Sequence, residues 1–184
     1  FVPLRHGKSS VNAGLIAEIL SGFNLSFAIR VHPCHLWLKR FMPADLIHRI
    51  GIAAPAETIY RAITTEEGVK AWWTTDVKMD ANVGGKAVFG FFDHSTVFQM
   101  RIEQLTPPSL VRWQCDGGSA PDWIGTTQEF VLEPQDDGEV LLKFCHGGWE
   151  RGGDHCYHCN TTWGHLLVCL KNYAEHGVKN PYFT

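Results

Sequence analysis

The stretch DHCYHCNTTWGHLLVCLKNYAEHG, residues 154–177, decides the fold of this chain. Its large apolar residues recur at the spacing that places them on one face of a helix; they are Trp163, Leu166, Leu167, Leu170 and Ala174. Gly177 stands where a glycine commonly ends a helix. The pattern predicts an amphipathic helix over Asp154 to His176, which needs an apolar surface to cover its stripe.

The chain between residues 46 and 146 can supply that surface as a β-sheet. Runs of β-branched and aromatic residues, bounded by Gly, Pro, Asp or Asn, predict strands. The predicted strands are 46–53, 75–79, 86–92, 96–105, 109–115, 125–133 and 139–146. Asp136-Asp137-Gly138 is typical of a hairpin turn, and the short connections favour antiparallel neighbours.

Alternation within these strands predicts one apolar face and one polar face, as in an antiparallel sheet covered on one side. The apolar positions are Phe98, Met100 and Ile102, then Phe130 and Leu132, then Val140, Leu142 and Phe144. Two short helices are predicted after the first strand, one beginning at Pro55 and one around Val69 to Trp73. The fold class is therefore α+β, a curved antiparallel sheet of about seven strands wrapped round the C-terminal helix.

The first part of the chain differs from the rest. Residues 1–41 carry no sustained period, although Val11 to Leu20 can form one short helix. We interpret residues 1–41 as an N-terminal extension and residues 42–184 as a single domain, which agrees with the usual domain size.

Composition narrows the function. The 184 residues are 45% hydrophobic and 19% charged, typical of a folded globule. Lys and Arg number 16 against 19 Asp and Glu, which argues against nucleic-acid binding as the main role. Charged residues interrupt the apolar segment 11–31, so no membrane span is predicted. Of the six cysteines, Cys115, Cys145 and Cys169 lie in strand-like or apolar helical runs and are interpreted as buried free thiols, which favours a cytoplasmic location.

Residues from about 45 to 177 resemble the START-like, or SRPBCC, helix-grip domains, and most closely the subgroup named after the heat-shock protein 90 ATPase activator homologues. The motifs that carry the resemblance are Pro55-Ala56-Glu57, Trp72-Trp73, Val83-Gly84-Gly85-Lys86, Pro107, Leu110-Val111, Trp113, His146-Gly147-Gly148-Trp149, Trp163 and Leu170-Lys171-Asn172-Tyr173. The resemblance implies a cavity between the sheet and the last helix. It implies no shared catalytic set.

A cavity also has a physical reason, because a bent sheet and a straight helix cannot pack flush along their whole length. Aromatic-lined gaps of this kind are common small-molecule sites. We predict a ligand site formed by the inward residues Phe89, Phe91, Phe98, Met100, Trp113, Phe130, Phe144 and His146, with Trp72 and Trp73 at one end and Trp149 at the entrance. The alternative is an ordinary aromatic core that side chains fill.

His146 is the one candidate for acid or base chemistry inside the predicted cavity. It shares a strand face with Leu142 and Phe144, and its unperturbed pKa lies near neutrality. A core histidine hydrogen-bonded to the backbone is the alternative, so no catalytic residue is assigned. Asp116 and Asp122 flank a glycine-rich loop and are expected to be solvated.

The most unusual stretch contains His155, Cys156, His158 and Cys159. Residues three apart share a helical face, so either the two histidines or the two cysteines are able to supply two of the four ligands of a zinc site. Completing it requires outside ligands such as His32, Cys34 or His35. A thioredoxin-like redox pair would need a preceding parallel strand, which this order lacks. We predict neither a metal nor a cofactor.

Three functions follow, in order of preference. The first is a protein that binds a small apolar or aromatic molecule. The second is a cavity enzyme of the cyclase, aromatase or hydrolase type that uses His146. The third, which the resemblance implies, is a co-chaperone-like ATPase activator, although residues 1–41 are too short to be the separate docking domain of the eukaryotic activators. The sequence leaves a homodimer open.

Overall fold

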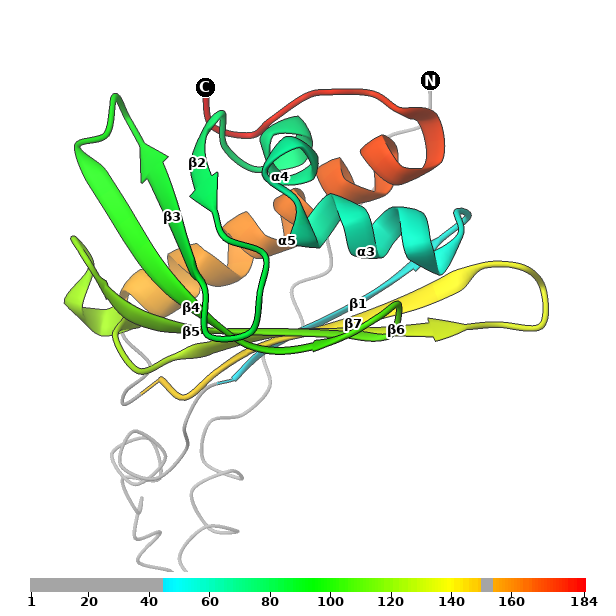
Figure 1. Cartoon of the computed structure of the whole chain (residues 1–184), viewed down its shortest axis with the longest axis horizontal. Coiled ribbons are helices and arrows are strands. Elements are labelled where there is room, and N and C mark those ends of the chain that lie inside the picture. The colour runs from blue at the N-terminus through cyan, green and yellow to red at the C-terminus, as the bar shows by residue number, and fades with distance from the viewer. Residues whose placement is uncertain (1–44, 150–153) are drawn as a thin grey trace, which may run out of the picture. The chain divides into compact units, whose positions relative to one another are not determined.

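The computed structural model describes residues 45–149 and 154–184 (Figure 1). The elements are β1 (Leu46–Ile52), α3 (Ala56–Thr64), α4 (Glu66–Trp72), β2 (Asp76–Met79), β3 (Lys86–Phe91), β4 (Thr96–Thr106), β5 (Leu110–Gly118), the short 3-10 helix η1 (Pro121–Trp123), β6 (Thr127–Pro134), β7 (Val140–Gly147) and α5 (Asp154–His176). The predicted α+β fold class is confirmed. The helix expected at 11–20 and the division at residue 41 lie outside the described residues.

The seven strands form one antiparallel sheet in the order β1-β7-β6-β5-β4-β3-β2. Cross-strand pairing places predicted inward residues opposite one another, such as Phe130 opposite Phe144. The register of β4 against β5 shifts at Gln99/Met100 and again at Ile102/Gln104. Such bulges bend a strand and increase its twist, which agrees with β2 and β3 rising beside the helices while β1, β6 and β7 lie beneath them (Figure 1).

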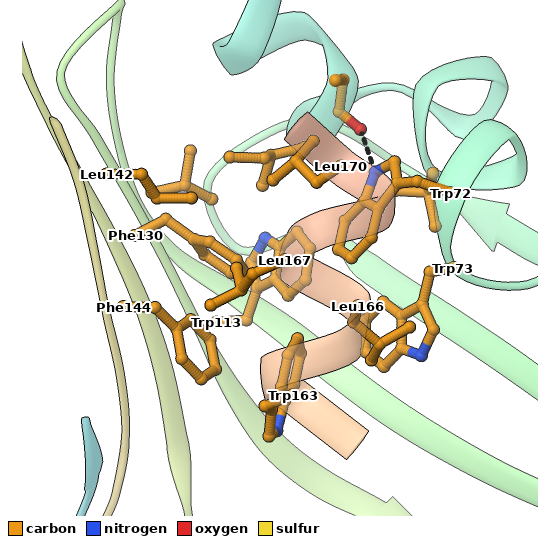
Figure 2. Packing of buried hydrophobic residues seen from close by; sticks show 14 of the residues in the cluster. Trp72, Trp73, Trp113, Phe130, Leu142, Phe144, Trp163, Leu166, Leu167 and Leu170 are labelled. Atoms are coloured by element: carbon orange, nitrogen blue, oxygen red, sulfur yellow. Dashed lines mark hydrogen bonds between the residues drawn. The ribbon is translucent and has the colours of Figure 1, made fainter. Parts of the chain in front are cut away.

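Helix α5 covers the apolar face of the sheet, and α3 and α4 lie on the same side (Figure 1). Its stripe of Trp163, Leu166, Leu167 and Leu170 is at most 2% exposed. Figure 2 shows these side chains facing Trp113, Phe130, Leu142 and Phe144 of the sheet. Within residues 45–149 and 154–184, no helix combines the length and hydrophobicity that a membrane-crossing segment requires.

The pair α3–α4 positions Trp72 and Trp73 against α5. Gly68 lets the two helices approach, because a Cβ there would lie 2.6 Å from the Cα of Ala62. The Thr65 hydroxyl caps α4 by accepting a hydrogen bond from the Gly68 N–H at 3.0 Å. Trp72 Nε1 then donates to the Ala62 carbonyl at 3.0 Å (dashed line in Figure 2).

After α5 the chain returns along α4, which sequence analysis did not predict (Figure 1). The N–H groups of Asn180, Tyr182 and Phe183 donate to the last carbonyls of this helix region, those of Ala71, Trp72 and Trp73, at 3.0, 3.2 and 2.9 Å. These are carbonyls that a helix end leaves without internal partners. The segment therefore fixes the Phe183 ring, which packs edge-on against Phe91 with centroids 4.9 Å apart.

Replacing Leu170 by Ala should destabilise the fold strongly, because this side chain is 0% exposed in the centre of the stripe. The expected loss is about 2–5 kcal/mol in the free energy of unfolding, measured by urea denaturation with unchanged m. The matched control is Val168→Ala on the same helix, where the side chain is 46% exposed and the expected loss is below about 1 kcal/mol. Equal losses for the two variants would contradict the packing of α5.

Candidate functional site

A cleft of about 250 Å³ opens at one end of α5, between that helix, the β3–β4 hairpin, η1 and the C-terminal segment. Aromatic side chains form most of its wall. The lining residues are Trp73, Phe91, Phe92, Thr96, Phe98, Trp123, His158, Cys159, Thr162, Trp163, Leu166 and Phe183.

The structure divides the predicted ligand residues into two groups. Trp73, Phe91 and Phe98 line the cleft. The other members are buried in the core around it: Trp72, Phe89, Met100, Trp113, Phe130, Phe144, His146 and Trp149. Side chains thus fill much of the space between sheet and helix, as Figure 2 shows for the region round Trp113. The opening lies along the N-terminal half of α5, where residues from His158 to Leu166 line it together with Trp123 of η1 and the β3–β4 hairpin.

Trp123 is the lining residue that sequence reasoning missed most clearly. It comes from η1, in the loop between β5 and β6, and is 4% exposed. Its ring stacks on Phe98, with centroids 4.1 Å apart and planes 6° apart, and meets His146 edge-on at 4.5 Å. Trp123 therefore forms a wall between the cleft and His146. A tryptophan within the polar, glycine-rich segment 116–126 was the available signal.

His146 lies behind that wall, 0% exposed, and side chains occupy both of its ring nitrogens. Trp163 Nε1–H donates to Nδ1 at 3.0 Å. Since an indole can only donate, Nδ1 carries no proton and the neutral ring holds its proton on Nε2. Nε2 lies 2.9 Å from the hydroxyl oxygen of Thr126, and that hydroxyl donates to the Trp123 carbonyl at 2.6 Å.

The Gln128 amide completes the surroundings of His146. Its nitrogen lies 2.7 Å from Nε2, while its oxygen has no partner within the described part of the chain. Amide oxygen and nitrogen are assigned from hydrogen-bond logic. Exchanging them makes the 2.7 Å contact a hydrogen bond that Nε2–H donates to the amide oxygen, beside the one to Thr126. The sequence alternative of a histidine hydrogen-bonded in the core fits this geometry, with side chains in place of backbone.

The cysteine and histidine stretch does not form a metal cluster in the part of the chain that the structure describes. Cys156 and Cys159 are buried, His158 is exposed, and the His155 side chain lies outside the described residues, as do His32, Cys34 and His35. The absence of a metal therefore stays a prediction.

The thiols of this stretch are poor nucleophiles. Burial raises the pKa of Cys159 to about 11, although the Trp123 indole beside it acts in the opposite direction. Burial also raises the pKa of Cys156. Because the reactive form of cysteine is the thiolate, both thiols stay protonated near neutral pH. Asp116 and Asp122 are exposed, as expected.

The β3–β4 turn forms the rim of the cleft. Three consecutive residues, Phe92, Asp93 and His94, have positive φ angles of 53°, 54° and 64°, a conformation that costs non-glycine residues free energy. His94 Nδ1 lies 2.6 Å from an Asp76 carboxylate oxygen, which helps to hold the turn. Phe92 is 66% exposed beside the opening. Strain of this kind clusters at functional sites.

Comparisons with known proteins agree with this architecture. The family profile described as "Activator of Hsp90 ATPase homolog 1-like protein" matches residues 53–175. The solution structure of the Aha1 dimer from Colwellia psychrerythraea is 36% identical, with a TM-score of 0.66, and the match covers 73% of this chain and 98% of that one.

More distant structures share the fold alone. A Mesorhizobium loti protein is 17% identical, with a TM-score of 0.62 and coverage of 70% of this chain and 95% of its own. A Staphylococcus saprophyticus protein is 17% identical, with a TM-score of 0.60 and coverage of 74% and 96%. No curated protein matches the chain.

The buried thiols predict a loss of stability at alkaline pH. The folded chain holds the Cys159 proton up to a pKa of about 11, whereas an ordinary thiol, as in the unfolded chain, releases it near 9.0. The contribution of Cys159 is therefore complete below pH 9 and decreases as pH rises from about 9 to 11. Urea denaturation should show a shallower decline for Cys159→Ala, by up to about 1.4 kcal/mol per pH unit.

The control for this prediction is Thr161→Ala, an exposed position on the same helix without a titrating group. It should retain the decline of the unmodified protein. Identical declines for Cys159→Ala and the unmodified protein would contradict the assignment.

Proposed function

Since the chain belongs to the family of activator of Hsp90 ATPase homolog 1-like proteins, we propose that it binds a small apolar or aromatic molecule in the cleft at the end of α5. The observation that carries the proposal is the open space itself, about 250 Å³ inside an aromatic wall. An apolar cavity of roughly 150 Å³ accommodates benzene. The cleft therefore has room for a two-ring molecule.

The walls of the cleft support binding because they are held in place before a ligand arrives. Trp73 is fixed between Phe89 and Trp163, with ring centroids 4.5 and 5.1 Å away. Trp123 is stacked on Phe98, and its carbonyl accepts from the Thr126 N–H at 2.9 Å. A preorganised site spends little binding free energy on ordering side chains.

Binding is favoured over catalysis because of where the acid–base candidate lies. His146 does not line the cleft, and Trp123 and Trp163 stand between its ring and the opening. Its Nδ1 already accepts a hydrogen bond from Trp163. A reaction through His146 would require Trp123 to leave its stack on Phe98.

We also propose that the chain forms a homodimer, since the Colwellia protein, 36% identical, was solved as a dimer. Large exposed apolar side chains are available to such a contact, including Phe92, Ile124 and Tyr157 at 66, 51 and 65% exposure. Activation of a chaperone ATPase is a further hypothesis that rests on the family description and on no contact within the described residues.

The ligand proposal predicts that filling the cleft abolishes binding. Thr162 lines the cleft, so Thr162→Phe should weaken the binding of tetralin, an apolar two-ring probe, about tenfold or more. Thr161→Phe adds the same ring at an exposed position on the same helix and should leave affinity within about twofold. NMR titration measures both. Equal affinities for the two variants, or no binding of tetralin to the unmodified protein, would contradict the proposal.

The dimer proposal predicts a mass of two chains in sedimentation equilibrium. Dissociation on dilution should follow a single monomer–dimer equilibrium. A mass of one chain at every concentration, up to the limit of solubility, would contradict a homodimer.

A further inference from the structure

The buried part of the cleft wall presents hydrogen-bond donors. Among its buried lining residues, the side chains with polar atoms are Trp73, Trp123, Cys159 and Trp163. An indole nitrogen donates only, and a protonated thiol is a donor and a weak acceptor. The Trp163 N–H is already used, because it donates to His146 Nδ1 at 3.0 Å. The Trp123 N–H is directed at the Cys159 sulfur. The remaining donors are the Trp73 N–H and the Cys159 S–H.

Trp73 has the most accessible of these donors. The residue is 2% exposed, yet its indole N–H has no hydrogen-bond partner among residues 45–149 and 154–184 and is not fully enclosed. Figure 2 shows its nitrogen directed away from Trp113 and Phe130 at the centre of the core. Since Trp73 lines the cleft, we take the cleft as the space that this N–H reaches.

Trp123 and Cys159 provide a second donor position. The Trp123 N–H is buried, and its acceptor in the described part of the chain is the Cys159 sulfur beside it. Cys159 is 5% exposed, and its S–H stays available as a donor. Both residues line the same cleft as Trp73.

The side chains that can accept hydrogen bonds lie nearer the solvent. Thr96 and Thr162 are half-buried and His158 is exposed. The Thr162 hydroxyl donates to the His158 carbonyl at 3.1 Å, which leaves its oxygen able to accept. Donors therefore lie deep in the cleft and acceptors lie towards its mouth.

We propose that the ligand of this cleft is a planar aromatic carbonyl compound whose oxygen points inward and accepts a hydrogen bond from the Trp73 indole N–H. This inference rests on the proposed function, because it assigns the chemistry of a ligand in the same cleft. An apolar ligand that covers the cleft would shut the Trp73 N–H off from solvent without giving it an acceptor. A buried donor without a partner costs free energy, so a ligand whose oxygen accepts from this N–H should bind more tightly than its hydrocarbon analogue.

The test compares two probes that differ in one group, 1-tetralone and tetralin. Affinities are measured by NMR titration for the unmodified protein and for Trp73→Phe, which removes the N–H and keeps an aromatic ring. The variant should weaken 1-tetralone about 3- to 10-fold more than it weakens tetralin. The quantity compared is the ratio of the 1-tetralone affinity to the tetralin affinity. The smaller ring of the variant affects both probes alike, so its effect cancels in this ratio.

Trp113→Phe is the matched control. The Trp113 N–H is also unpartnered within the described residues, and the residue is 0% exposed, but it does not line the cleft. Its replacement should leave the ratio of the two affinities unchanged. A second measurement uses the unmodified protein alone. In its NMR spectrum, 1-tetralone should move one indole N–H proton signal downfield, and tetralin should not.

The outcomes separate the two proposals. Tetralin binding with a ratio unaffected by Trp73→Phe, and no downfield indole shift with 1-tetralone, would overturn the carbonyl inference and leave the proposed function standing. Failure of both probes to bind the unmodified protein would overturn both. A changed ratio in Trp73→Phe alone, together with the downfield shift, would support the inference.

Discussion

The fold depends on one contact surface, the apolar stripe of α5 against the concave face of the sheet. Without it neither layer is stable, since a single amphipathic helix and a one-sided sheet must each bury an apolar face. The stripe begins at Trp163, which packs on Phe144 of the sheet and stacks near Trp123 of η1, and continues to Leu170. The cleft lies where this contact is incomplete, so the open space and the stability of the fold arise from the same surface.

The periodicity of apolar residues in the sequence was sufficient to predict the main strands and the long helix. Alternation along β4, β6 and β7 identified the covered face, and the stripe that starts at Trp163 identified the helix, because both patterns repeat over many residues. Even the short strand at Asp76–Met79 was predicted. The bulges of β4 were not, since a register shift depends on the partner strand.

The cleft was harder to predict, because the pattern identifies which side chains point inward but not which of them leave a gap. Phe98 and Phe144 share the same inward alternation, yet only Phe98 lines the opening. Trp123 and Phe183 come from segments without any period, and their positions follow from a loop and from hydrogen bonds to the end of α4. Residues of this kind become visible only in three dimensions.

The hydrogen bonds around His146 have a consequence for the plasticity of the site. Trp163, His146, Thr126 and the Trp123 carbonyl form one continuous chain of hydrogen bonds. Two neighbouring sides of the opening, Trp123 and Trp163, are therefore connected through His146, a buried residue that does not line the cleft. Exchange of the imidazole or of the Thr126 hydroxyl for an apolar group would uncouple those sides. The shape of the cleft therefore depends on positions that do not line it.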